Sequence, residues 1–97
     1  MSNFIKLTEI KEISQRWPSN IKKYILDEVM VNSSKIVTLR DGSFFKKEMK
    51  MHKGWPSGLD ERIVLTEILL NLNGDGNIIY AVGDFENIAK KMGVGNG

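Results

Sequence analysis

The segment at residues 62–92 restricts the fold of this chain more than any other part. It reads RIVLTEILLNLNGDGNIIYAVGDFENIAKKM, in which the turn at 73–77 separates two apolar stretches. Asn, Asp and Gly accept the positive φ angles that tight hairpin loops need. The second stretch, 78–82, is rich in β-prone residues and is bounded by Gly83. We therefore expect a β-hairpin whose second strand covers 78–82.

The first arm of this hairpin, residues 62–72, has two interpretations. As a strand it places alternate residues from Val64 to Leu72 on one face, whereas as a helix it gives an apolar stripe that begins at Leu65. Periodicity alone does not decide between the two. We favour the strand because the turn connects this arm to a second β-prone stretch.

A short amphipathic helix is expected at 84–92. Asp84 stands at the N-cap position, where its carboxylate can accept from the free N–H groups of the first turn. Gly93 suits the position after the helix because glycine readily adopts a left-handed conformation. Between them an apolar stripe has helical spacing, at Phe85, Ile88, Ala89 and Met92.

The N-terminal half alternates between strand-like and loop-like segments. Asp41-Gly42 is a strong hairpin signal and predicts a strand that returns at 43–51. This strand would direct Phe45, Met49 and Met51 to one face, and its lysines are hard to bury. We therefore expect it at or near an edge of the sheet. The other expected segments are strands at 4–10, 21–31 and 35–40 and loops at 11–20 and 52–60.

Length and composition indicate a small globular protein. The 97 residues, 41% of them hydrophobic, predict a single domain, 1–97, with a tail at 93–97 that we expect to be mobile. The absence of Cys excludes disulfides, thiolate metal sites and cysteine nucleophiles. No stretch reaches the ~20 apolar residues of a membrane-spanning helix. Charged residues interrupt the N-terminus, so no signal peptide is expected, and we expect a soluble, cytoplasmic protein.

No combination of residues satisfies the requirements of a catalytic or metal site. The segment that begins at Asn71 resembles the first half of a calcium-binding EF-hand loop, but Asn71 replaces the first carboxylate and Val82 stands where a bidentate acid is needed. His52 is the only histidine, and its neighbours in the sequence offer no catalytic partner. We therefore expect no enzymatic activity, no bound metal and no cofactor.

A basic segment around residue 50 is the candidate binding site. Residues 1–53 hold eleven Lys and Arg against six Asp and Glu, a balance of +5, whereas 54–97 carry −3. Lysines and aromatic residues together suit a protein partner or nucleic acid, which is held through phosphate contacts and stacking. A solvated face whose lysines prevent aggregation is the alternative interpretation. The candidate partner-binding residues are Phe44, Lys46, Lys47, Lys50, Lys53 and Trp55.

Several apolar patterns resemble a known group of proteins. The stretches IKLTEI, EVMVNSSKIVTL and YAVGDFENIAKKM follow one another as in the small FlbD/SwrD-like flagellar proteins of bacteria and their phage-associated relatives. The best matches are 29–36 and 82–92, and the chain has insertions at about 11–22 and 43–60. The resemblance implies a small β-sheet with a C-terminal helix, no catalysis, and a binding or regulatory role.

Two DNA-binding families share parts of the pattern. Residues 84–95 resemble the opening helix of a helix-turn-helix without its recognition helix, and a LytTR-type domain has a similar strand-and-helix rhythm. We expect the fold to be an α+β domain with a small curved antiparallel sheet of about five strands and a C-terminal helix at 84–92. We expect a non-enzymatic protein-interaction or regulatory module, whose partner is another protein or a second copy of the chain. The alternative is a nucleic-acid-binding transcriptional regulator that uses the basic N-terminal half.

Overall fold

The computed structural model describes residues 4–15, 21–52, 54–56 and 58–93 of the 97-residue chain. These residues form an open antiparallel sheet of five strands and two α-helices, one of them C-terminal, which confirms the predicted α+β class. Within them, no helix is long and apolar enough to cross a membrane. In chain order the elements are β1 (Phe4–Gln15), β2 (Ile21–Asn32), the 3₁₀ turn η1 (Ser33–Lys35), β3 (Ile36–Asp41), α1 (Ser43–Met51), β4 (Leu65–Leu72), β5 (Asp75–Val82) and α2 (Phe85–Lys91).

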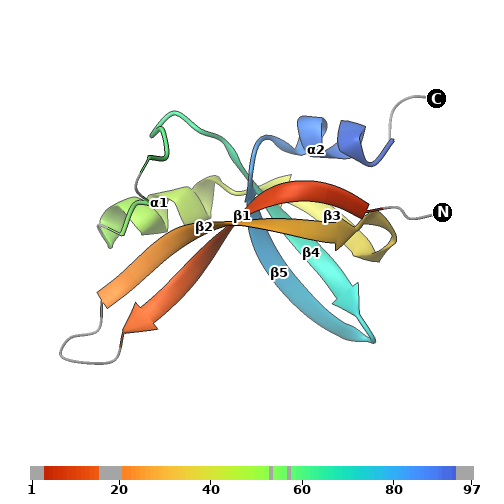
Figure 1. Cartoon of the computed structure of the whole chain (residues 1–97), viewed down its shortest axis with the longest axis horizontal. Coiled ribbons are helices and arrows are strands. Elements are labelled where there is room, and N and C mark those ends of the chain that lie inside the picture. Colours follow the sequence, from red (N-terminus) through yellow and green to blue (C-terminus); the bar gives the residue numbers. More distant parts are fainter. Residues whose placement is uncertain (1–3, 16–20, 53, 57, 94–97) are drawn as a thin grey trace.

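The sheet is open because its two edge strands do not pair with each other. The order is β2-β1-β5-β4-β3, and every neighbouring pair is antiparallel. β2 and β3 follow each other in the chain through η1, yet they form the two opposite edges of the sheet. The β1–β2 hairpin and the β4–β5 hairpin therefore meet only through β1 and β5. Figure 1 shows the two hairpins crossing and their far ends diverging below the helices.

The predicted hairpin is confirmed, and its first arm is a strand. β4 and β5 pair as far as Leu72 and Asp75, which leaves Asn73 and Gly74 as a two-residue turn. Both turn residues have positive φ angles, 54° and 89°, as the favoured hairpin turns require. β5 is longer than predicted because the residues after this short turn already belong to the strand.

The predicted C-terminal helix is confirmed as α2. Oδ1 of Asp84 accepts a hydrogen bond from the amide of Asn87 at 2.8 Å, so Asp84 is the N-cap. Gly93 follows the helix with a φ of 82°. Ile88 is buried, but Phe85 at the start of the apolar stripe is 45% exposed. The helix thus begins and ends where the local sequence predicts, whereas only part of its stripe reaches the core.

Replacing Asp84 with Ala is expected to lower the free energy of unfolding by about 1 kcal/mol, because it removes the side-chain acceptor for the Asn87 amide. Asp84→Asn keeps an acceptor oxygen and is expected to be nearly neutral. Urea denaturation of the wild type and both variants measures the difference. Equal midpoints for the wild type and Asp84→Ala would show that this cap does not stabilise the protein.

Each face of the sheet carries its own hydrophobic cluster. Successive residues of a strand point to opposite faces, and each helix covers one of these faces. α1 contributes Met49 to a cluster with Ile10, Tyr24 and Leu65. α2 contributes Ile88 to the larger cluster on the other face, whose members are Ile5, Leu7, Val31, Ile68, Leu70, Ile79, Ala81 and Ile88.

The prediction of a strand at 43–51 is wrong, because this segment is the helix α1. Asp41 does not open a hairpin: its carboxylate accepts from the amide of Ser43 at 3.0 Å and supports the first helical turn. Phe45 and Met49 are four residues apart, a spacing that aligns them on a helix as well as on a strand. Their helical neighbours are mostly Lys, Glu and Met, which favour helix. The segment therefore cannot be an edge strand, and the edges are β2 and β3.

Gly42 allows the turn before α1 to pack directly on β4. A Cβ atom at this position would lie 3.0 Å from the Cβ of Leu65 and 3.1 Å from its carbonyl carbon and oxygen. The amide of Gly42 also donates to that carbonyl oxygen at 2.8 Å. A side chain here would push α1 away from the strand that it covers.

Gly42→Ala is expected to lower the free energy of unfolding by about 1–3 kcal/mol through this overpacking. Gly76→Ala is the matched control, because its Cβ would make only an ordinary contact, 3.6 Å from Cδ1 of Leu69. Thermal or urea denaturation compares the two variants. Equal stability of both would contradict the close approach at Gly42.

The predicted loop at 11–20 is wrong in its first part. β1 continues to Gln15 and β2 begins at Ile21, so that the pairing runs along the whole length of both strands. Polar residues are compatible with this extension because Lys11 and Glu12 are exposed there. Residues 16–20 of that loop and 94–97 of the predicted tail lie outside the described residues.

Candidate partner-binding site

The predicted site residues on α1 lie on different sides of the helix. Phe44 is 74% exposed, and Lys47 and Met51 on the same side of the helix are exposed as well. Lys46 is half-buried, and its Nζ donates to the carbonyl oxygen of Ile63 at 2.7 Å. The outer side of α1 thus offers apolar surface with one lysine, whereas Lys46 links the helix to the segment that leads into β4.

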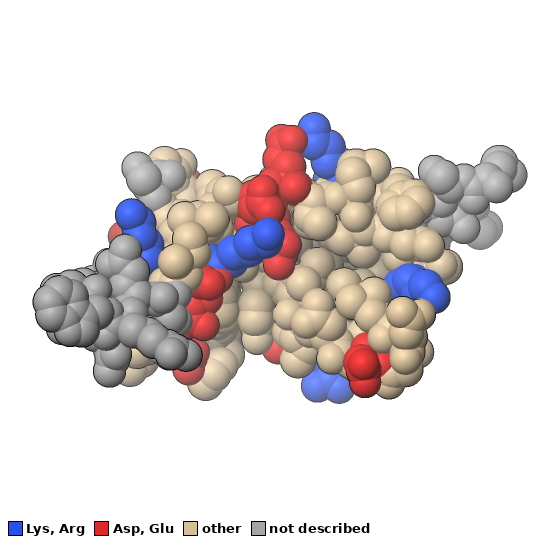
Figure 2. Space-filling view, turned by 60° about the horizontal axis from the view of Figure 1, so that its bottom comes forward, with Lys and Arg blue, Asp and Glu red and all other residues tan. Residues whose placement is uncertain are grey.

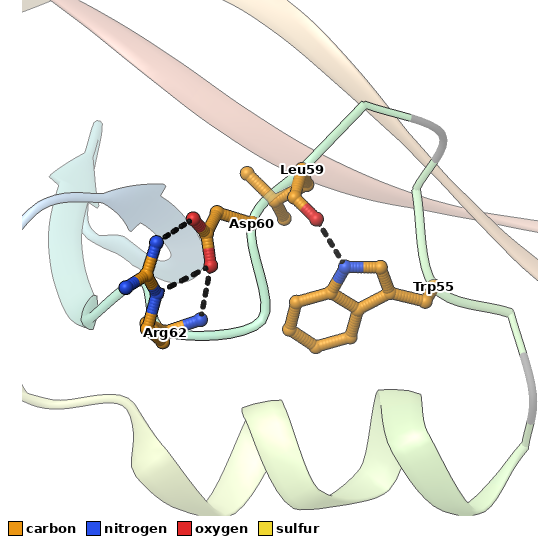
Figure 3. A network of polar contacts seen from close by, with 4 residues as sticks. All are labelled: Trp55, Leu59, Asp60 and Arg62. Carbon is orange, nitrogen blue, oxygen red and sulfur yellow. Dashed lines mark hydrogen bonds and ion pairs between the residues drawn. The ribbon is translucent and has the colours of Figure 1, made fainter.

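Trp55 and Lys50 form part of the packing between α1 and the loop that follows it. Nε1 of Trp55 donates to the carbonyl oxygen of Leu59 at 2.7 Å, and the half-buried indole points into this loop (Figure 3). Nζ of Lys50 lies 5.8 Å from the centroid of the Trp55 ring, within the range of a cation–π interaction. Lys53 lies outside the described residues. The structure therefore places Phe44 and Lys47 on the surface and gives Lys46, Lys50 and Trp55 contacts within the chain.

An ion pair between Asp60 and Arg62 lies at the end of the same loop. Oδ2 of Asp60 lies 2.9 Å from Nη2 of Arg62, and Oδ1 accepts from the Arg62 amide at 2.8 Å (Figure 3). These bonds from Arg62 lower the pKa of the Asp60 carboxyl. Because both side chains are largely exposed, the pair orients the loop and adds little stability.

A second candidate site lies between β1 and β5, at the point where these two neighbouring strands stop pairing and separate. Only two pairs of residues, Glu9↔Ala81 and Ile10↔Tyr80, join these strands. Beyond them β1 continues through 11–15 and β5 through 75–79, and neither stretch pairs with the other among the described residues. In a sheet, every second residue directs its N–H and C=O toward the neighbouring strand. Among the described residues, these two stretches therefore pair with no strand on the sides that face each other.

A groove of about 390 Å³ occupies this division. Ile10 from β1, Phe45 from α1 and Tyr80 from β5 bring apolar and aromatic surface into it. Phe45 stacks on Tyr80 with a centroid distance of 3.8 Å and an interplanar angle of 7°. The lining residues are Glu9, Ile10, Lys11, Glu12, Phe45, Ile78, Ile79 and Tyr80.

Tyr24 and Tyr80 hold the Phe45 ring from two sides. The ring of Tyr24 meets Phe45 edge-on at 5.6 Å, with an interplanar angle of 87°. The hydroxyl of Tyr80 donates to Oε1 of Glu67 at 3.2 Å. Burial, followed by the charge of Glu67, raises the pKa of Tyr80, and burial raises that of Tyr24 in the same way. This aromatic cluster fixes α1 against the start of the groove.

The tyrosine pKa values predict how stability changes at alkaline pH. Their folded pKa lies above the ordinary 10.0, so the stabilising contribution is complete below that pH and is lost as the pH rises through the folded pKa. We expect the free energy of unfolding to decline in this alkaline range, and less steeply in Tyr80→Phe, which cannot ionise at that position. Urea denaturation at neutral and alkaline pH tests this, and equal slopes for both chains would contradict it.

Charged side chains gather along the middle of the face drawn in Figure 2, which turns the lower side of Figure 1 toward the viewer. Asp and Glu run across this middle with basic side chains among them, beside a largely uncharged lobe. Glu9 and Glu12 line the groove. Lys11, the lysine among the lining residues, lies 2.8 Å from Oδ2 of Asp27. The charged lining residues of the groove are thus two glutamates and one lysine, in contrast to the lysine-rich site that the sequence predicts.

A second hollow, of about 380 Å³, lies next to η1. Val29 and Val31 from β2 and Leu70 and Leu72 from β4 are among its lining residues. Glu9 and Ile79 line both hollows. The hollow near η1 lies on the face of the sheet that carries Leu70 and Ile79, whereas Ile10 in the groove points to the opposite face.

Sequence reasoning missed the groove because its lining comes from three distant segments. The only local feature of the sequence that relates to the groove is the presence of apolar strand residues such as Ile13 and Ile78. In the structure these two residues are 41% and 50% exposed. Their exposure depends on the division of the sheet, and nothing in the strand pattern predicts that division. Tyr80 and Phe45 read as ordinary core positions in the sequence.

The described residues contain no group of three or more His, Cys, Asp and Glu side chains that could hold a metal ion. The turn that resembles an EF-hand loop is a hairpin in which Oδ1 of Asn71 accepts from the Gly74 amide at 3.0 Å. Comparison with known proteins adds no relative, since no family model, curated protein or solved structure matches this chain.

Proposed function

We propose that this chain is a protein-interaction module that takes up an extended segment of a partner protein in the groove between β1 and β5. The observation that carries the proposal is the division of the sheet after two residue pairs. Strand addition, in which a peptide completes an exposed sheet edge, uses main-chain hydrogen bonds to that edge for affinity. The pockets beside the edge then select side chains.

The residues around the facing edges of β1 and β5 favour strand addition over docking of a partner on a flat surface. Phe45 and Tyr80 give the groove an aromatic floor, and aromatic residues are frequent anchors of binding energy. Ile13 on β1 and Ile78 on β5 expose apolar surface beyond the last residue pair of these two strands. A segment bound here would bury surface that the free chain leaves in water.

Three further proposals rest on the sequence alone. We propose that the chain has no catalytic activity, that it belongs to the FlbD/SwrD-like group and that it is cytoplasmic. The outer side of α1, with Phe44 and Lys47, is the competing surface for a protein partner. A second copy of this chain is one partner that could supply an edge strand, since β2 and β3 end the sheet.

Selection from a displayed library of random peptides, followed by NMR mapping, tests the proposal. We expect enriched peptides to shift the backbone amides of 11–13 and 76–79 in the isotope-labelled chain. N-methylation of alternate peptide amides should abolish binding, because it removes the main-chain donors. Phe44→Ala is the matched control on the competing surface and should leave binding unchanged.

The same experiment can overturn the proposal in two ways. Enriched peptides whose shifts centre on Phe44 would assign the interaction to α1. Peptides that still bind after N-methylation of either set of alternate amides would exclude strand addition as the mode of binding.

A further inference from the structure

The hollow beside η1 has the size and the lining of a small-molecule site. Its volume is about 380 Å³, and most of its lining comes from β2, β4 and β5. Val31, Leu70 and Ile79 form its buried part and belong to the larger of the two hydrophobic clusters. Sites for small molecules measure roughly 300–1,000 Å³ and are lined mainly by hydrophobic side chains. The hollow can therefore take a small ligand with an apolar body.

Three large apolar side chains around this hollow remain in contact with water. Phe4, Met30 and Leu72 are 50%, 58% and 44% exposed, and all three line the hollow. They come from three different strands, β1, β2 and β4. Exposed apolar residues that gather in one place indicate a binding surface, whereas single ones need no explanation. A ligand seated among them would remove this apolar surface from water, which favours binding.

The concave shape favours a small molecule over a second copy of the chain. In a two-fold symmetric dimer the same surface patch meets itself. A hollow that faces its own copy leaves the space inside it unfilled, and the residues around unfilled space lose packing contacts. An apolar molecule that enters the hollow supplies these contacts.

Lys35 supplies a positive charge at one end of the hollow. It lines the hollow from η1, and it lies near Asn71 because both residues line a smaller neighbouring depression. Among the residues that the structure describes, its ammonium group has no ion-pair or hydrogen-bond partner. An anionic group placed at Lys35 therefore does not have to displace an existing partner.

Glu9, the other charged lining residue, lies toward the opposite end of the hollow. It pairs with Ala81 of β5. Asn71, near Lys35, pairs with Gly76 of the same strand. From Ala81 to Gly76 the strand rises by about 16 Å, which exceeds the screening length of ~8 Å at physiological ionic strength. Glu9 therefore does not neutralise Lys35, and the two charges orient an anion with its charged end at Lys35.

We propose that this hollow binds an amphipathic carboxylate, a molecule with a hydrocarbon chain and one anionic end group. The chain packs on Val31, Leu70 and Ile79, and the carboxylate lies at the Lys35 ammonium group. A single lysine balances the single charge of a carboxylate better than the charge of a phosphate, which approaches −2 at neutral pH. The site is separate from the strand-addition groove, so the proposal does not depend on that function.

Three ligands with the same alkyl chain test the proposal: decanoate, decanol and decyltrimethylammonium. Each is titrated into the isotope-labelled chain at neutral pH. NMR follows the amides of Val31 and Leu70, because these residues line the hollow and not the groove between β1 and β5. We expect saturable shifts, with decanoate binding several-fold more tightly than decanol and the cation binding most weakly. Added salt should reduce the preference for decanoate, since Lys35 is exposed.

Variants of the chain separate the charge from the apolar contacts. Lys35→Gln should lower the affinity for decanoate to that for decanol, whereas Lys90→Gln changes an exposed lysine of α2 outside the hollow and should have no effect. Leu72→Thr should weaken binding of all three ligands, because it removes apolar surface from the hollow. Val64→Thr is its control, since Val64 is 51% exposed and does not line the hollow. A denaturation midpoint for each variant verifies that the fold is retained.

Two results would overturn the proposal. Equal affinities for decanoate and decanol, or a preference for decanoate that survives Lys35→Gln, would show that the hollow does not select an anion. Unchanged amides of Val31 and Leu70 with all three ligands would show that the hollow binds no amphipathic molecule. Neither result bears on strand addition, which the N-methylated peptides test at the other site.

Discussion

Met49→Ala is expected to lower the free energy of unfolding by about 2–5 kcal/mol. The Met49 side chain has 0% exposure and packs with Ile10, Tyr24 and Leu65 on the face of the sheet that α1 covers. Its truncation leaves a cavity between helix and sheet, which the rigid strands cannot close fully. Urea denaturation monitored by circular dichroism measures the loss.

Met51→Ala provides a control within the same helix. Met51 is 76% exposed, so its truncation is expected to change stability by less than about 0.5 kcal/mol. A strand at 43–51 would instead place Met49 and Met51 on one face and give both substitutions similar effects. Equal losses for the two variants would therefore contradict the helix and restore the strand.

Phe45→Ala is expected to cost about 2–4 kcal/mol, because it removes the ring held between Tyr24 and Tyr80. The loss combines buried area with two aromatic contacts. It should also weaken peptide binding, since Phe45 forms part of the floor of the groove. The free energy of unfolding and the peptide affinity can be measured on the same purified variant.

Phe44→Ala is the matched control for this substitution. Phe44 is 74% exposed, so its removal should change stability by less than about 0.5 kcal/mol. If Phe44→Ala reduces partner binding while Phe45→Ala does not, the outer side of α1 is the interaction surface. A large stability loss in both variants would show that α1 is packed differently from the arrangement described above.

The elements that local chemistry specifies were predictable from the sequence. The positive φ angles at Asn73 and Gly74 require the kinds of residue that the turn contains. The Asp84 carboxylate caps the helix that follows it. In both places the deciding interactions lie within a few residues of each other, so a single stretch of sequence contains the whole reason for the structure.

The helix α1 was not predictable from the spacing of apolar residues, because the spacing of Phe45 and Met49 fits both the helical and the strand period. Residues four apart lie on one face of a strand and also on one face of a helix. The decision depends on distant residues: Tyr24 and Tyr80 enclose Phe45, and Gly42 lets the helix approach Leu65. These contacts join segments separated by many residues, and no local pattern contains them.

The groove was not predictable from the sequence for a related reason. It exists because β1 and β5 separate after Ile10 and Tyr80, a consequence of how two hairpins cross in space. The predicted basic site combined residues that are neighbours in the sequence, whereas α1 directs Phe44 and Lys46 to different surroundings. The groove instead combines residues from distant segments, such as Ile10, Phe45 and Tyr80.

Hydrogen exchange of backbone amides along β5, measured by NMR with and without a groove-binding peptide, tests the central claim most directly. In the free chain, residues of 75–79 whose amides point to β4 should be protected, while the alternate amides that face the groove should exchange fast. Bound peptide should slow the fast set, because its backbone supplies the missing partners. Uniform protection along β5 in the free chain, or no change at these amides when peptide is bound, would contradict an open edge that accepts a partner strand.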